Sequence, residues 1–73
     1  MEKVFIDTEY ITLGQFLKYT GIIYNGGEAK RAVKELKIAV NGGLESRRGC
    51  KIYPGDEVKI EKKAFLVVAR HEN

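Results

Sequence analysis

Positively charged side chains are concentrated in the middle third of this 73-residue chain. Residues 28–51 contain seven lysines and arginines against three glutamates, although the formal net charge of the whole chain is only +3. The chemistry open to such side chains is anion binding, because ammonium and guanidinium groups neutralise phosphates and a guanidinium can do so with two parallel hydrogen bonds. This uneven distribution predicts a surface that faces a polyanion.

The first cluster of cations follows a helical repeat. Lys30, Lys34 and Lys37 are spaced i, i+4 and i+7, and Arg31 lies beside them. Like charges at this spacing cost a few tenths of a kcal/mol per pair, so the row has no obvious stabilising role. A phosphate backbone would neutralise it and release counterions. The alternative is a solvated helix face, and the helix alone does not decide between the two interpretations.

The second cluster is a loop, Arg47-Arg48-Gly49, with Lys51 just beyond it. Arginine binds phosphate oxygens and stacks on unpaired bases, and a loop glycine lets a ligand approach the backbone closely. Two adjacent arginines are a weak motif by themselves. We expect the predicted hairpin to bring them close to the basic helix.

Aromatic side chains add possible stacking platforms for nucleobases. The phenylalanines lie in apolar patterns and are expected in the core. Tyr19 lies off the apolar stripe of the first predicted helix, beside Lys18, and is the best exposed candidate. The other tyrosines are Tyr10, Tyr24 and Tyr53.

No catalytic or cofactor-binding constellation is found in the sequence. His71 lies near the last residue and is expected to be a solvated tail residue. Cys50 has no histidine beside it and is expected to fill a small apolar space. Asp56 and Glu57 are adjacent, so in a strand they would point to opposite faces. Metal-ligand and phosphate-loop spacings are missing as well. We therefore expect no enzymatic activity, no metal, no cofactor and no small-molecule substrate.

Composition predicts one cytoplasmic domain over residues 1–73. The apolar fraction of 44% is ordinary for a globular protein. No apolar run approaches the ~20 residues that span a bilayer, and the start does not resemble a signal peptide, so no membrane partner is expected. A single cysteine fits a reducing compartment.

The elements that must position the cations begin with a short strand at residues 4–6. A first helix starts at Thr12, since Gln15 stands at capping-box spacing, and it stops at Gly21. A second helix starts at Asn25 and runs through about Leu36, with Glu28 near its positive end.

A small antiparallel sheet follows the helices. Asn41-Gly42-Gly43 has the turn chemistry of a hairpin between residues 38–40 and 44–46. Pro54-Gly55-Asp56 predicts a second tight turn after residues 50–53. Residues 58–60 and 64–69 complete the sheet. The prediction is an α+β fold: a short leading strand and two small helices packed on a small antiparallel sheet.

These features together resemble a known family. Ala29-Lys30, Val40-Asn41-Gly42 and Gly55-Asp56, at this spacing, are similar to the RNA-binding domain named after ribosomal small-subunit protein four, the alpha-L motif. The similarity covers about residues 12–60. The run from Gly26-Gly27 to Pro54-Gly55-Asp56 is most similar to the small stand-alone bacterial YaaA-type branch.

The resemblance implies that the second helix and the loop after the hairpin flank an RNA-binding groove. Such domains bind ribosomal or transfer RNA and have no catalytic activity of their own. Asn41-Gly42 would be the structural hairpin turn of the motif. The residues predicted to bind RNA are Lys18, Lys30, Arg31, Lys34, Lys37, Arg47, Arg48 and Lys51.

The chain departs from the family pattern at three places. Many relatives begin the first helix with Arg-Leu-Asp, where this chain has Thr12-Leu13-Gly14. Gly26 stands where an arginine often begins the second helix, and Leu36 where a glycine commonly ends it. Two familiar RNA contacts are therefore missing.

Two function classes follow from the sequence. The leading hypothesis is a non-catalytic module that binds structured RNA, ribosomal or transfer RNA, alone or in ribosomal particles. The alternative is a protein-interaction module whose basic patch docks an acidic partner in a ribosome-assembly or DNA-maintenance complex, since electrostatic complementarity would look similar in the sequence.

Overall fold

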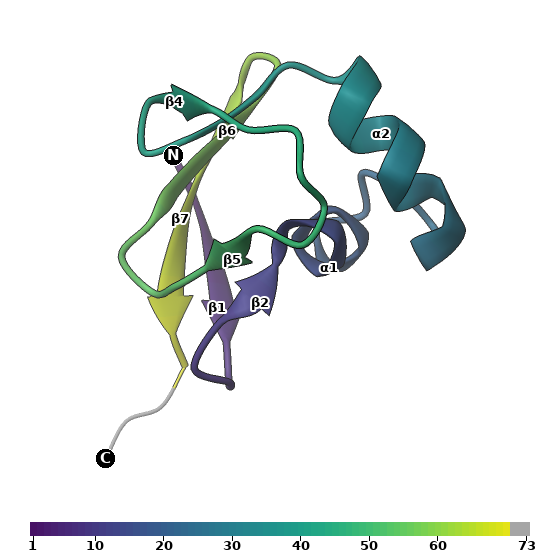
Figure 1. Ribbon diagram of the computed structural model, residues 1–73. Helices are drawn as coiled ribbons and strands as arrows, with labels where there is room; N and C mark the ends of the chain where they lie inside the picture. Colours follow the sequence, from purple (N-terminus) through teal and green to yellow (C-terminus); the bar gives the residue numbers. More distant parts are fainter. Residues whose placement is uncertain (71–73) are drawn as a thin grey trace.

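Residues 1–70 are described by the computed structural model, and they contain two β-sheets (Figure 1). The larger sheet has five strands, in the order β1 (Glu2–Ile6), β7 (Lys63–Ala69), β6 (Glu57–Ile60), β3 (Ile38–Val40) and β4 (Gly43–Leu44). The smaller sheet pairs β2 (Ile11–Thr12) with β5 (Lys51–Ile52) in antiparallel fashion.

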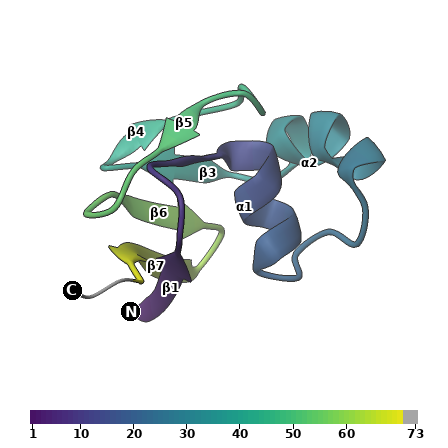
Figure 2. The same ribbon diagram turned by 90° about the horizontal axis from the view of Figure 1, so that it is seen from below.

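The helices lie to one side of the larger sheet. They are α1 (Leu13–Tyr19) and α2 (Ala29–Glu35), and a 3-10 turn, η1 (Gly26–Glu28), leads into α2. Figure 2 shows α1 between the sheet and α2. The predicted α+β class, with two small helices on a mostly antiparallel sheet, is confirmed.

The leading strand pairs in a way that the sequence did not indicate. β1 is parallel to β7, with Val4 opposite Val67, whereas every other pairing in the larger sheet is antiparallel. A parallel pair needs a long crossover connection. Here the connection comprises almost the whole chain, including both helices. The first and last described strands therefore lie side by side although they are far apart in the sequence.

The core lies between the sheet and α1. Strand alternation directs Val58 and Phe65 inward from neighbouring strands. Phe16 of α1 is fully buried and meets Phe65 edge-on, with ring centroids 5.4 Å apart. Leu13 and Leu17 of α1 are also fully buried. This packing stabilises a helix that is too short to form alone.

Helix α1 begins and ends as predicted. The Thr12 hydroxyl accepts a hydrogen bond from the Gln15 amide at 3.2 Å, and the Gln15 side chain accepts one from the Thr12 amide at 2.9 Å. This reciprocal pair is the capping box. Gly21 follows the helix with a φ of 82°, the left-handed conformation that glycine adopts without strain.

Helix α2 differs from the prediction at both ends. A 3-10 turn precedes the helix, and Asn25 makes no side-chain capping bond. The Glu28 carboxylate instead accepts a hydrogen bond from the Tyr24 amide at 3.1 Å. The helix ends at Glu35, because Leu36 is extended with φ −88° and ψ 146°. A negative φ requires no glycine there. Lys37 therefore lies beyond the helix, and the predicted i+7 position for it was wrong.

The hairpin turn after β3 is confirmed and is tied to a second turn. Asn41 has φ 51° and Gly42 has φ 87°. The Asn41 side chain donates to Asp56 Oδ1 at 3.0 Å and accepts from the Glu57 amide at 2.9 Å. Asp56 Oδ2 in turn accepts from the Tyr53 amide at 2.8 Å. The strand after the hairpin is shorter than predicted and ends at Leu44.

Replacing Asn41 separates the two roles of this residue. Asn41→Gly keeps the positive φ and removes both side-chain bonds, whereas Asn41→Ala also places a Cβ in a left-handed conformation that costs roughly 1–2 kcal/mol. We expect the free energy of unfolding in urea to fall for both variants, and further for Asn41→Ala. Equal stability of the two variants would contradict the strain argument.

Candidate nucleic-acid interface

The basic loop is attached to the start of α1 by backbone hydrogen bonds. The Leu13 amide donates to the Cys50 carbonyl at 2.8 Å, and the Gly14 amide donates to the Arg48 carbonyl at 2.9 Å. The first amides of a helix have no partner within the helix. Two of these amides thus hold residues 48–50, whose path beside the helices is visible in Figure 1.

Gly14 is the point where α1, α2 and this loop meet. A Cβ at this position would lie 3.3 Å from the Ala29 Cβ, 3.5 Å from the Arg48 carbonyl oxygen and 3.6 Å from the Arg48 Cβ. The absence of a side chain at Gly14 therefore brings Arg48 close to the start of α2. Lys30 follows Ala29 directly, so the two predicted basic segments approach each other here.

Further along α2 the helix and the segment just before the basic loop border a groove. Lys34 and Lys37 line one side, and Glu45 and Ser46 line the other. Lys30 shares the face of Lys34, because residues four apart lie above one another on a helix. We call the exposed face formed by Lys30, Lys34, Lys37 and Arg48 the basic surface.

Among the described residues, the four cations of the basic surface form no ion pair. Within residues 1–70 the ion pairs involve Arg31, Arg47 and Arg70. Lys30, Lys34 and Arg48 are all exposed. Their mutual repulsion is therefore relieved only by solvent and salt, as expected for side chains that meet a polyanion.

Arg47 stabilises the loop in which it lies. Its Nε and Nη2 donate to the two Glu45 carboxylate oxygens at 2.8 and 3.1 Å, and its backbone amide donates to Glu45 Oε2 at 3.0 Å. These hydrogen bonds, from the side chain first and the backbone second, lower the pKa of Glu45 to about 2. The same pair raises the pKa of Arg47. Arg47 and Arg48 therefore differ in role, although the sequence analysis gave both the same one.

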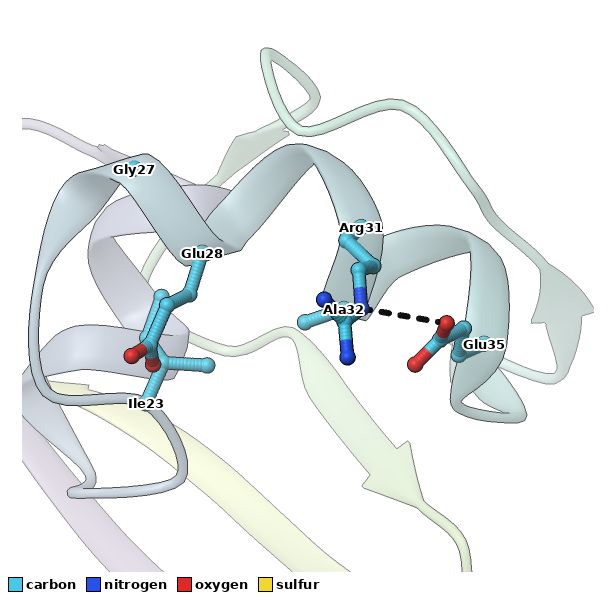
Figure 3. A pocket seen from close by; sticks show the side chains of 6 residues that line it. All are labelled: Ile23, Gly27, Glu28, Arg31, Ala32 and Glu35. Atoms are coloured by element: carbon cyan, nitrogen blue, oxygen red, sulfur yellow. Dashed lines mark hydrogen bonds and ion pairs between the residues drawn. The ribbon is translucent and has the colours of Figure 1, made fainter.

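Arg31 precedes Lys34 by three residues in α2, but its side chain is engaged by an acidic partner. Its Nε is 3.2 Å from Glu35 Oε2, and the two side chains line a separate hollow together with Glu28 and Ile23 (Figure 3). The pair is exposed and contributes little to stability. Arg31 therefore differs from Lys34, Lys37 and Arg48, which form no ion pair within residues 1–70.

Lys18 and Tyr19 lie in the last turn of α1, at the opposite end of that helix from Gly14. The Tyr19 hydroxyl donates to the Phe5 carbonyl at 2.8 Å and accepts from Arg70 Nη2 at 3.1 Å. Tyr19 is more than half exposed, as predicted, but these bonds hold it against β1 rather than beside the basic surface.

Cys50 and Asp56, which were weighed as catalytic or metal-binding residues, take part in packing and in turns. Cys50 is half-buried against the core, and burial raises the pKa of its thiol. Asp56 is bound to the two turns described above. Among residues 1–70 no group of three or more histidine, cysteine or acidic side chains is placed to hold a metal ion. His71 lies outside the described residues.

No helix in the described part of the chain combines the length and apolar character needed to cross a membrane.

Comparison with known proteins identifies the family. Residues 4–68 match the profile described as the S4 domain. This chain belongs to the S4 domain family. Within this S4 domain, the match extends from β1 to β7 and includes every residue of the basic surface.

Two relatives cover most of the S4 domain. One, from Bacillus subtilis (strain 168), is named "Probable ribosome maturation protein RlbA"; it is 54% identical over 56 residues, which is 77% of this chain and 79% of the relative. Another, from Escherichia coli (strain K12), is named "Putative RNA-binding protein YbcJ"; it is 35% identical over 60 residues, 82% of this chain and 86% of the relative.

Two features of the site were missed by sequence reasoning. The Glu45–Arg47 pair was not predicted, although two residues of opposite charge separated by one residue in a loop are a detectable signal. The contact of Gly14 with Ala29 and Arg48 joins segments far apart in the chain, so no local pattern reveals it.

The Glu45–Arg47 pair has a measurable titration. We expect the side-chain carboxyl of Glu45, followed by NMR, to titrate with a pKa near 2 in the wild type and to move toward its ordinary value of 4.5 in Arg47→Gln. Because the folded pKa is depressed, the stabilising effect of this pair is complete above pH 4.5 and is lost as the pH falls toward 2.

Arg31→Gln is the control for this titration, since Arg31 is paired with Glu35 and should leave Glu45 unchanged. A wild-type Glu45 that titrates at its ordinary value would show that the loop is not held by Arg47.

Proposed function

We propose that this chain is a non-catalytic, cytoplasmic, single-domain RNA-binding protein that holds structured RNA, ribosomal or transfer RNA, on its basic surface. The observation that carries the proposal is the meeting of two separate cationic segments at Gly14, with none of the four cations in an ion pair within residues 1–70.

The relatives support the same function. One is named as a ribosome maturation protein and the other as an RNA-binding protein. Both alignments span most of the relative's own length. Ribosomal RNA within an assembling particle is therefore the RNA class we favour.

The chemistry of the basic surface suits the backbone of folded RNA. Double-stranded RNA is recognised mostly by shape and by contacts to phosphates and 2′-hydroxyls. Lysines supply point charges, and the guanidinium of Arg48 can bind one phosphate with two hydrogen bonds. With Lys51, which follows the loop, the surface offers five cations. Binding through these should give a slope of log affinity against log salt of roughly −3.5 to −4.5.

A triple substitution with a matched control tests the assigned surface. Lys30→Gln, Lys34→Gln and Arg48→Gln together should weaken binding to an RNA hairpin at least about tenfold and reduce the salt slope by roughly 2 to 3, since three phosphate contacts are lost. Fluorescence anisotropy at several salt concentrations measures both quantities.

The matched control carries Lys3→Gln, Lys59→Gln and Arg31→Gln. It removes two lysines of the sheet and the arginine of α2 that is paired with Glu35, all of them exposed. We expect it to bind nearly as well as the wild type. Equal losses in the two variants would mean that net charge, and not the basic surface, governs binding.

A further inference from the structure

We propose that the outer face of the β2–β5 sheet stacks an unpaired nucleobase, so that the preferred RNA is a duplex flanked by single-stranded nucleotides. This inference rests on the proposed RNA-binding function and specifies the kind of RNA. Its central residues are Tyr10, Lys51 and Tyr53.

The strand register places these three side chains together. Ile11 is opposite Ile52 and Thr12 is opposite Lys51 in the antiparallel pair. The residue before Ile11 is therefore opposite the residue after Ile52, and the rings of Tyr10 and Tyr53 are 5.4 Å apart at 45°. Because Ile52 is fully buried and side chains alternate along a strand, Tyr53 and Lys51 point away from the core.

The exposed aromatic surface is paired with a cation. Tyr53 is 41% exposed, so part of its ring is open to a ligand. The Lys51 ammonium lies 4.9 Å from the centre of the Tyr10 ring. A ring beside a cation suits the two parts of a nucleotide, since the base stacks on the ring while the ammonium neutralises its phosphate.

A polar hollow borders Tyr10 and could hold the edge of the base. It is lined by Thr8, Glu9, Thr12 and Gln15. Gln15 is exposed, and its side-chain oxygen already accepts the Thr12 amide as part of the capping box. The amide nitrogen of Gln15 therefore remains as a donor to a base.

The stacking face is continuous with the basic surface. Arg48 and Cys50 bind the start of α1 through their carbonyls, and Lys51 follows directly in β5. An RNA whose duplex backbone lies on Lys30, Lys34 and Arg48 would thus meet Tyr53 where its pairing ends. Tyr19 and Tyr24 have no such continuity, since Tyr19 is bound to β1 and Tyr24 precedes η1.

The experiment compares a blunt RNA hairpin with the same hairpin carrying a short single-stranded tail, at either end in turn, with 2-aminopurine in the tail. We expect one tailed hairpin to bind about five- to a hundredfold more tightly than the blunt one, as one stacked base would give. Its 2-aminopurine fluorescence should be quenched on binding. Tyr53→Ala should abolish both effects and leave binding of the blunt hairpin unchanged.

Three variants make the result specific. Tyr53→Phe keeps the ring and should keep the preference for the tail. Tyr53→Leu keeps apolar packing without a π face and should lose the preference, which guards against a Tyr53→Ala variant that unfolds. Tyr24→Ala removes a tyrosine at a different place on the surface, where it is 86% exposed. This variant should behave as the wild type.

The outcomes separate this inference from the function on which it rests. If wild type and Tyr53→Leu bind blunt and tailed hairpins equally well, stacking is refuted and RNA binding by the basic surface stands. If the wild type binds neither hairpin at low salt, the proposed function fails, and the stacking site fails with it.

Discussion

The two hydrogen bonds from the start of α1 to the carbonyls of Arg48 and Cys50 are the interaction on which the site depends. They use amides that a helix cannot satisfy internally to hold a loop that has little secondary structure of its own. The loop is therefore ordered before any ligand arrives, which lowers the entropic cost of binding. Because α1 is itself fixed by the buried Phe16, the position of Arg48 is set by the core.

Acidic side chains in this structure mainly hold turns and loops. Glu45 binds Arg47, Asp56 binds Asn41 and the Tyr53 amide, and Glu61 accepts the Lys37 amide at 2.7 Å. None of these bonds neutralises the side chains of Lys30, Lys34 or Arg48. The modest net charge of +3 thus conceals a local surface of one sign. Such a surface is costly to the isolated protein and favourable only beside an anion.

Sequence reasoning succeeded where the signal is local. The capping box at Thr12, the positive-φ turn at Asn41-Gly42 and the turn at Pro54-Gly55 each depend on a few neighbouring residues, and each is present. The end of α2 was placed too late, because Leu36 continues the apolar stripe although its backbone is already extended. An apolar residue fits both a helix face and the start of a strand, so periodicity alone could not distinguish them.

Pairings between distant segments could not be predicted. The parallel pairing of β1 with β7 joins residues more than sixty positions apart. The β2–β5 pair is two residues long, too short for an alternation to be recognised. Gly14 was regarded as a lost family contact, whereas the structure shows a close approach of α1 to Ala29 and Arg48. That contact is what converts two basic stretches of sequence into one surface.

The most direct test of this account is an NMR titration of the 15N-labelled protein with an RNA hairpin. If the two segments form one surface, the amide resonances of residues 30–37 and 47–51 should shift together, with the same apparent dissociation constant, while those of β1 and β6 remain nearly unchanged. Shifts confined to one of the two segments, or centred on the outer face of the larger sheet, would contradict it.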